Sequence, residues 1–418
     1  MPLASANFFD PAEVRDPAER EAELMATLPW VLAAAQRDAP AYRDRLNGIR
    51  AEAIDSREAL ASLPLTRKSE LIELQRRNRP FGGFTTVPTA QLGRVFASPG
   101  PIYEIEARRP DFFRMARALF AAGFRAGELI HNTFSYHLTP AGAMLESAAL
   151  ALGCPVIPAG TGQTEQQLMT IADLRPVGYV GTPSFLKILL DRATAAGADI
   201  TSLTKALVGA EAFPAVLRED FRVRGIAALQ CYGTADLGLI AYETTAPDGS
   251  PCEGMVVDEG IILEIVEPGS GTPVGPGEVG EVVVTTLSPE YPLIRFATGD
   301  LSALLVEPSP CGRTNQRIKG WLGRADQSAK VRGMFVHPSQ IVEILKRHPA
   351  VRRGRLVIER PASTDVMTLM IETGAPDEAS VIAATAQAVT KLRTDVSCVA
   401  SGSLPQDGKL IDDRRPIA

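Results

Sequence analysis

The sequence predicts an α/β protein with a large N-terminal domain, built on mainly parallel sheets plus an antiparallel β subdomain, and a small α+β C-terminal domain. Three observations carry this prediction. Short apolar runs alternate with helix-length segments from Pro110 to Gln230, which is typical of a parallel sheet covered on both faces. After Pro251, strand-like segments follow one another without helices, which indicates antiparallel pairing. A charged, glycine-containing stretch, 323–339, is typical of an exposed joint between domains.

Bulk properties limit the expected partners. The chain of 418 residues is long enough for two domains. Its 43 Lys+Arg and 49 Asp+Glu residues give a net charge of −6, and this argues against a nucleic-acid partner because no basic surplus meets the phosphates. The 5 cysteines have no regular spacing, so a reduced, cytoplasmic location is expected. No apolar stretch reaches the length of a membrane span, so no membrane partner is expected.

The N-terminal part reads as helical. Over residues 8–60 apolar side chains recur at helical spacing, and Leu24, Leu28 and Leu32 share one face. Pro64–Lys68 then precedes another predicted helical turn, for which Thr66 is a candidate N-cap.

Segments that could bind a ligand follow three of the predicted parallel strands, and ligands of such sheets bind at the carboxyl ends of the strands. These segments are 132–137, 209–213 and 232–236. The first holds His137 between aromatic neighbours. An isolated histidine is usually a satisfied polar residue, whereas flanking by Phe134 and Tyr136 favours a pocket.

The antiparallel subdomain is predicted from strands 261–266 and 280–286. Asp300 follows in Thr298-Gly299-Asp300, where it is either a turn residue or a fixed acceptor with two oxygens. Beyond the joint we expect helices at 342–346 and 377–392 and strands at 354–358 and 366–371.

Taken together, these segments resemble the motifs of adenylate-forming enzymes, and most closely those of the phenylacetate–coenzyme A ligase family. The matching stretches are Gly209-Ala210-Glu211, Tyr232-Gly233-Thr234-Ala235-Asp236, Thr298-Gly299-Asp300, Gly323-Arg324-Ala325-Asp326 and Pro338-Ser339-Gln340-Ile341. Each match alone is weak, but their order along the chain is specific. The resemblance spans nearly the whole sequence.

The resemblance implies a nucleotide site. Gly209–Glu211 would lie along the adenine, Tyr232 would face the nucleotide, and the Asp300 carboxylate would accept both ribose hydroxyls. The full set of implied nucleotide-binding residues is Ser98, Gly100, Gly209, Ala210, Glu211, Tyr232, Gly233, Thr234, Asp300 and Arg324. Asp236 would hold Mg²⁺ through its carboxylate.

The remaining roles also come from the resemblance. Phe134, Tyr136 and His137 would line the acyl pocket. Lys409 would neutralise charge on the carboxylate and α-phosphate as the adenylate forms, and Asp326 would be the hinge. The implied domains are 1–325, which carries the acid and nucleotide sites, and 326–418, which is mobile. The N-terminal segment that ends in Lys68 would pack on the large domain and do no chemistry.

The phosphate loop departs from the family pattern. In the family a loop rich in Ser, Thr and Gly, ending in Lys, holds the β- and γ-phosphates of ATP. Here Ser98-Pro99-Gly100-Pro101 offers few donors, since proline has no N–H, and Glu104 adds like charge. A rigid Pro-Gly turn and a working phosphate loop are equally compatible with this stretch.

The implied function is an acid–thiol ligase with ATP, Mg²⁺ and coenzyme A as cofactors. It would activate a small carboxylic acid, aryl or arylacetic, as an acyl-adenylate and transfer it to coenzyme A. Two alternatives stay open: a nucleotide- or acyl-CoA-binding homologue with impaired catalysis, and an adenylating enzyme with another acceptor. The sequence also leaves a homodimer open.

Some relatives carry a Cys/His cluster that could hold zinc. In this sequence only Cys311 remains at the corresponding positions, with Cys252 nearby, so we expect no zinc.

Overall fold

The computed structural model describes residues 7–98, 101–268, 270–325, 329–332, 334–336, 338–361, 364–373, 378–405 and 409–415. The chain divides into two compact units. The first consists of Met1–Thr298 and Ser302–Trp321, and the second of Gly299–Leu301 and Leu322–Ile417. The fold is α/β, as the alternating pattern predicts.

The largest sheet of the first unit has the strand order β14-β15-β10-β9-β8-β7-β6-β4-β5. Its strands are β4 (Ile130–Asn132), β5 (Val156–Pro158), β6 (Gly178–Gly181), β7 (Lys205–Val208), β8 (Ala227–Thr234), β9 (Gly238–Tyr242), β10 (Met255–Val257), β14 (Leu304–Leu305) and β15 (Arg317–Ile318). From β5 to β8 the pairing is parallel, and from β8 onward it is antiparallel.

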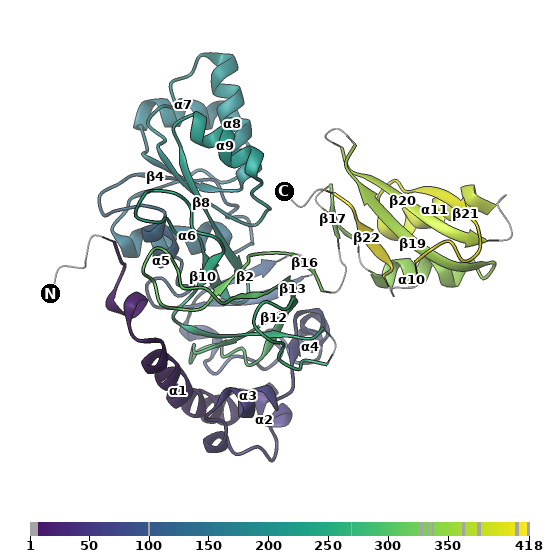
Figure 1. Ribbon diagram of the computed structural model, residues 1–418, viewed down its shortest axis with the longest axis horizontal. Coiled ribbons are helices and arrows are strands. Elements are labelled where there is room, and N and C mark those ends of the chain that lie inside the picture. The colour runs from purple at the N-terminus through teal and green to yellow at the C-terminus, as the bar shows by residue number, and fades with distance from the viewer. Residues whose placement is uncertain are drawn as a thin grey trace. The chain divides into compact units, whose positions relative to one another are not determined.

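Helices cover both faces of the parallel part. They are α5 (Ala116–Ala121), α6 (Ala141–Leu152), α7 (Thr164–Leu174), α8 (Pro183–Ala196) and α9 (Ala215–Val223). The helices α7, α8 and α9 lie together beside the sheet (Figure 1). Successive strand residues point to opposite faces, so Tyr179 packs with α7 and α8 whereas Val180 packs with α5 and α6. Both faces are therefore apolar, which explains the continuous hydrophobic runs in these strands.

A second sheet is formed by β1 (Thr66–Arg67), β11 (Ile261–Val266), β12 (Gly280–Thr286) and β13 (Phe296–Ser302), with β16 (Gly323–Arg324) beside β13. Residues 299–301 of β13 and all of β16 belong to the second unit. The predicted cap at Thr66 is wrong, because Thr66 pairs with Phe296 as an edge strand. The helix that follows, α4 (Leu71–Arg77), begins only after a 3-10 turn, Lys68–Glu70. A separate hairpin joins β2 (Leu92–Ser98) to β3 (Ile102–Ala107).

The N-terminal segment is helical, as predicted. It contains α1 (Pro17–Asp38), α2 (Pro40–Arg45) and α3 (Arg57–Ala61), with 3-10 turns at Pro11–Val14, Ala51–Ala53 and Thr89–Gln91. Asp16 caps α1 by accepting hydrogen bonds from the first turn. Leu24, Leu28 and Leu32 are all buried, so the predicted apolar face is confirmed.

A buried ion cluster fixes the start of the chain to the body of the first unit. The Glu13 side chain is fully buried and accepts a hydrogen bond of 2.8 Å from the Tyr242 hydroxyl. Its carboxylate also lies 3.0 Å from Arg313 and 3.5 Å from Arg117. A charge taken out of water needs such partners, so the cluster joins residues far apart in the sequence.

The second unit has its own core. The sheet order is β21-β20-β19-β22, from β19 (Val351–Glu359), β20 (Val366–Thr373), β21 (Asp395–Val399) and β22 (Ile411–Asp413). Helices α10 (Pro338–Arg347) and α11 (Ala379–Thr390) pack with this sheet, and β17 (Ala329–Val331) pairs with β18 (Met334–Val336). The two helices and two strands expected beyond the joint correspond to α10, α11, β19 and β20, and α11 is shorter than the expected 377–392, whose first residue lies outside the described residues.

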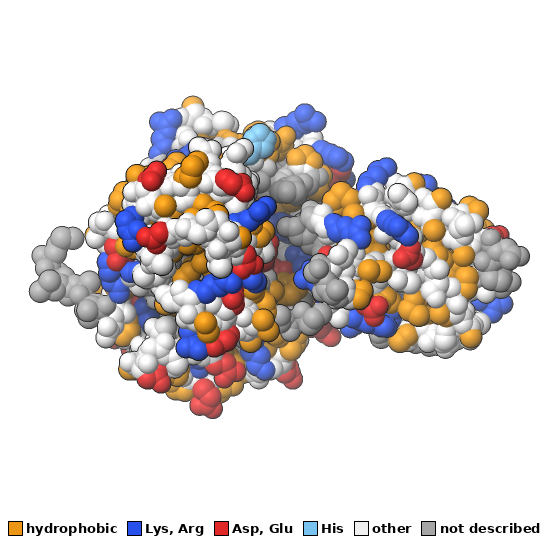
Figure 2. Space-filling view, turned by 90° about the horizontal axis from the view of Figure 1, so that it is seen from above, with side chains coloured by type: hydrophobic (Ala, Val, Ile, Leu, Met, Phe, Trp, Pro, Cys, Tyr) orange, Lys and Arg blue, Asp and Glu red, His pale blue; other side chains and the backbone are white. Residues whose placement is uncertain are grey.

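The surface mixes charge types. Figure 2 shows acidic, basic and hydrophobic side chains interspersed over the face that it presents. Within the described ranges, every helix is too short or too polar to span a lipid bilayer.

Candidate active site

Two of the predicted segments come together where β4 and β7 end. Gly209 follows β7, and a side chain there would lie 3.1 Å from the Cys231 sulfur and 3.9 Å from the Phe134 ring. Only glycine fits this close approach without displacing a neighbour. Ala210 has a φ of +64°, a left-handed conformation that turns the chain sharply after the strand. Ala210 and Glu211 are exposed, so this turn is open to a ligand.

The third segment lies where the sheet changes from parallel to antiparallel pairing. Residues 227–230 of β8 pair with β7, and residues 231–234 pair with β9. The strand therefore includes residues 232–234, which the sequence analysis expected to follow it. A side chain at Gly233 would lie 2.6 Å from the Gly238 carbonyl oxygen, which explains the glycine. The Thr234 hydroxyl accepts a hydrogen bond of 3.1 Å from the Leu237 N–H and so closes the turn that carries Asp236.

Asp236 is the predicted magnesium ligand, and its side chain is fully buried. One carboxylate oxygen accepts a hydrogen bond from the Lys68 ammonium group. The other oxygen is buried and has no hydrogen-bond partner among the described residues. An orphaned carboxylate oxygen fits Mg²⁺, which is often held by one or two carboxylates together with substrate phosphates. Within the described ranges, no group of three or more His, Cys, Asp and Glu residues could hold a metal ion.

Lys68 contacts the predicted magnesium ligand, although the sequence analysis expected no catalytic role for the segment that ends in Lys68. The motif that ends in Lys68 was visible, but nothing in its spacing connects it to a turn far along the chain. Pairing of Thr66 and Arg67 with β13 carries the next residue, Lys68, to Asp236. The N-terminal segment therefore packs on the large domain at Lys68 by contacting the predicted magnesium ligand.

The predicted phosphate loop lies at the β2–β3 hairpin, where Ser98 pairs with Ile102. The Ser98 hydroxyl donates a hydrogen bond to the Glu104 carboxyl group, and the Ser98 N–H donates another at 3.3 Å. Glu104 is only 1% exposed. Burial, together with the negative charge of Asp236, raises the pKa of Glu104 to about 8. Gly100, the other predicted donor, lies outside the described residues.

Tyr291 is a buried residue whose pKa is influenced by Asp236 and Glu104. Its hydroxyl is buried and has no hydrogen-bond partner within the described part of the chain. Burial raises the pKa of Tyr291, and the charges of Asp236 and Glu104 add to this effect. No sequence pattern points to Tyr291, because it lies in a loop between β12 and β13.

Asp300 and Arg324, both predicted to bind the nucleotide, lie side by side in the second unit. They are directly paired residues of β13 and β16, and the Arg324 guanidinium donates a 3.1 Å hydrogen bond to the Asp300 carboxylate. Lys409 is exposed and lies two residues before β22. The predicted hinge residue Asp326 lies outside the described residues.

The predicted acyl-pocket residues differ in burial. Phe134 is buried near Gly209. Tyr136 accepts a hydrogen bond of 2.8 Å from the Asn132 amide, and its ring packs so closely on Gly142 that a side chain there would approach to 2.8 Å. His137 is exposed. Phe134 therefore lies beside the residues predicted to bind adenine, whereas Tyr136 packs on the start of α6.

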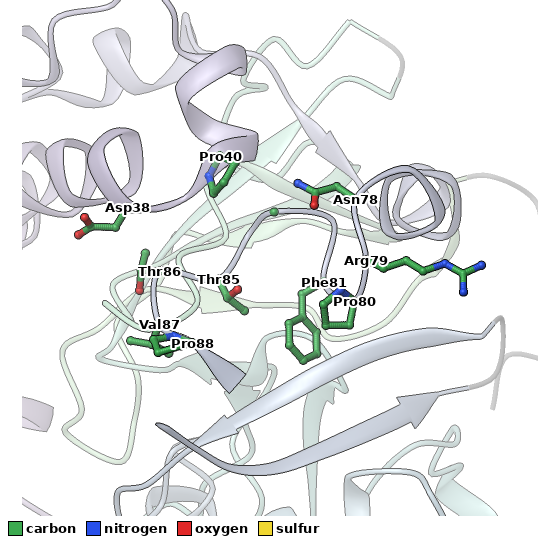
Figure 3. A pocket seen from close by; sticks show the side chains of 11 residues that line it. Asp38, Pro40, Asn78, Arg79, Pro80, Phe81, Thr85, Thr86, Val87 and Pro88 are labelled. Carbon is green, nitrogen blue, oxygen red and sulfur yellow. The ribbon is translucent and has the colours of Figure 1, made fainter. Parts of the chain in front are cut away.

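One cavity of about 300 Å³ lies elsewhere (Figure 3). It is lined by Asp38, Pro40, Asn78, Arg79, Pro80, Phe81, Gly83, Thr85, Thr86, Val87 and Pro88. Arg79 points away from the other labelled side chains in Figure 3. All these residues belong to the N-terminal segment, and none is a predicted site residue.

Comparison with known proteins shows matches over most of this chain. Residues 118–288 match the family described as AMP-binding enzyme. A phenylacetate-coenzyme A ligase of Thermus thermophilus is 33% identical over 354 residues, which cover 81% of this chain and 78% of that protein. A phenylacetate-coenzyme A ligase of Escherichia coli is also 33% identical, over 87% of this chain and 85% of that protein.

Solved structures agree at the level of the fold. A crystal structure of 2-hydroxyisobutyryl-CoA ligase, in complex with 2-HIB-AMP and CoA, has a TM-score of 0.77 at 24% identity, over 99% of this chain and 95% of that one. An amide bond synthetase from Marinactinospora thermotolerans has a TM-score of 0.51 at 17% identity, over 92% of each chain.

Proposed function

Because this chain belongs to the phenylacetate–coenzyme A ligase family of adenylate-forming enzymes, we propose that it activates an aryl or arylacetic acid with ATP and transfers the acyl group to coenzyme A. It is an AMP-forming ligase. In the first step, the carboxylate attacks the α-phosphate of ATP, which gives the acyl-adenylate and pyrophosphate. In the second, the thiol of coenzyme A attacks the acyl carbonyl, which gives the thioester and AMP.

The observation that carries the proposal is the Asp236 carboxylate, buried at the β8–β9 turn with one oxygen unpartnered among the described residues. Asp236 would hold Mg²⁺, which supplies positive charge for the phosphates. Asp300 and Arg324 would position the ribose, and Gly209–Glu211 would give the adenine a flat surface. Lys409 would stabilise the charge that develops on the α-phosphate. Residues 1–325 would then be the domain of the acid and nucleotide sites, and 326–418 a domain that turns about Asp326 between the two steps.

The decisive experiment measures pyrophosphate release over a panel of aromatic, arylacetic and aliphatic acids, with and without coenzyme A. We expect release with one class of acid and thioester formation only when coenzyme A is present. Release that supports transfer to an amine or a carrier-protein thiol, but not to coenzyme A, would indicate another acceptor.

A second candidate function is favoured by the Ser98–Glu104 contact. If an internal carboxyl group permanently occupies these donors, the chain would bind nucleotides without adenylating an acid. Binding of AMP without pyrophosphate release for any acid would identify this homologue with impaired catalysis.

A further inference from the structure

Ser98 and Glu104 form an arrangement of the kind that binds phosphate. The backbone N–H and the hydroxyl of Ser98 converge on a single carboxyl group. In this chain that carboxyl group belongs to Glu104, six residues further along the same hairpin. Because Glu104 is 1% exposed, its carboxyl group is enclosed within the protein.

The surrounding charges do not favour additional anions. The Lys68 ammonium group contacts the Asp236 carboxylate, so part of its charge is already neutralised. Asp236 and Glu104 interact electrostatically with each other, and Asp236 is fully buried. The phosphates of ATP would therefore enter a region in which the Lys68 charge is already paired with a buried carboxylate.

We infer that Glu104 determines the nucleotide selectivity of this enzyme, because its carboxyl group occupies the Ser98 donors that the β- and γ-phosphates of ATP would use. The chain thus binds AMP and acyl-adenylate in preference to Mg·ATP. This inference rests on the proposed function, since it concerns the same nucleotide site. AMP has no β- or γ-phosphate, so its affinity is independent of Glu104.

The size of the effect follows from the strength of a hydrogen bond to a charged group. Freeing one such donor for phosphate changes the dissociation constant by about ten- to hundred-fold. We expect Glu104→Ala to bind Mg·ATP at least about ten-fold more tightly than the parent chain, with AMP affinity unchanged within about two-fold. Glu104→Gln removes the ionisable group but keeps an acceptor for Ser98, so its gain should be smaller.

The test titrates the full chain and its variants with AMP and with Mg·ATP by calorimetry. Adding Ser98→Ala to Glu104→Ala should abolish most of the gain, because the freed hydroxyl is then absent. Glu106→Gln is the matched control, since Glu106 is a buried glutamate of the same strand whose carboxylate accepts hydrogen bonds from Arg94 at 2.8 and 3.0 Å. Glu106→Gln should change neither affinity.

The outcomes separate this inference from the proposed function. Unchanged or weaker Mg·ATP binding by a folded Glu104→Ala protein that still binds AMP would overturn the inference and leave the function intact. If Glu104→Ala does not fold, the parent chain decides, because equal affinity for AMP and Mg·ATP would overturn the inference as well. A parent chain that binds neither nucleotide contradicts the proposed function itself.

Discussion

Lys68 and Asp236 form an ion pair at the candidate site. Asp236 is fully buried, and the Lys68 side chain is 29% exposed, so removing the lysine leaves a buried carboxylate without its cation. We expect Lys68→Met to reduce the free energy of unfolding by about 2–4 kcal/mol in urea denaturation. Lys187→Met, which breaks an exposed ion pair of 2.7 Å with Asp191, should cost less than about 0.5 kcal/mol. Equal losses would indicate that the Lys68 pair is an ordinary surface contact.

Asp300 is the residue from which we predict the strongest effect on nucleotide affinity. Its carboxylate is fixed by Arg324 and is 8% exposed, as suits an acceptor that holds two ribose hydroxyls. Asp300→Ala should weaken both AMP and ATP binding by at least about a hundred-fold, as measured by calorimetry, because two charge-assisted hydrogen bonds are lost. A folded variant with unchanged affinity for both nucleotides would exclude Asp300 from the ribose site.

At the scale of elements, the β2–β3 hairpin and the β8–β9 turn, which form the candidate site, could be predicted only in part. The order of the motifs places Gly209, Tyr232 and Asp236 at the ends of neighbouring strands, because parallel strands leave the sheet at one edge. Lys68 and Tyr291 could not be found in this way, since edge pairing of Thr66 with Phe296 and burial of a loop tyrosine depend on tertiary contacts. The same limit explains why β8 was predicted too short: its last residues pair with β9, which follows it in sequence, instead of β7.

The start of α5 is stabilised by a side-chain contact from the loop before it. The Asp111 carboxylate accepts a hydrogen bond of 3.1 Å from the Ala116 N–H, so the helix begins five residues after Asp111. Burial raises the pKa of Asp111 from 3.8 to about 7, and the charge of Asp258 adds to this effect. Between these pH values the folded state binds more protons than the unfolded state, so the free energy of unfolding decreases as the pH rises.

Asp111→Asn removes this ionisation while keeping an acceptor for Ala116. The variant should therefore be more stable than the parent chain at pH 8, by roughly 1–3 kcal/mol, and the difference should shrink towards pH 4. Urea denaturation of both proteins at the two pH values measures the effect. If the two proteins differ in stability by the same amount at pH 8 and at pH 4, Asp111 does not titrate in this range.

At the scale of the whole molecule, the two half-reactions should depend on different parts of the C-terminal domain. Lys409→Ala should stop pyrophosphate release from acid and ATP while thioester formation from supplied acyl-adenylate continues, because in the proposed mechanism the lysine would stabilise charge only during adenylation. Lys346→Ala, which removes another exposed lysine of this domain, is the control and should affect neither step. If the Lys409 variant still releases pyrophosphate at the original rate, Lys409 takes no part in adenylation.

The proposed rotation about Asp326 predicts the opposite effect. Asp326→Pro fixes the φ angle, so thioester formation should slow by at least about ten-fold while adenylation is retained. Asp326→Ala, which keeps backbone freedom, should leave both steps near their original rates. Loss of both half-reactions in the proline variant would argue against a hinge and for a structural defect.

The ion cluster around Glu13 has a consequence for the time course of folding. Its carboxylate and the Arg313 guanidinium lie 3.0 Å apart in space but are separated by most of the first unit along the chain. During synthesis, Glu13 leaves the ribosome long before Arg313 does. We therefore expect the 3-10 turn Pro11–Val14 to complete its docking last, once nearly all of the large unit has been translated, so that contacts of high sequence separation complete its folding.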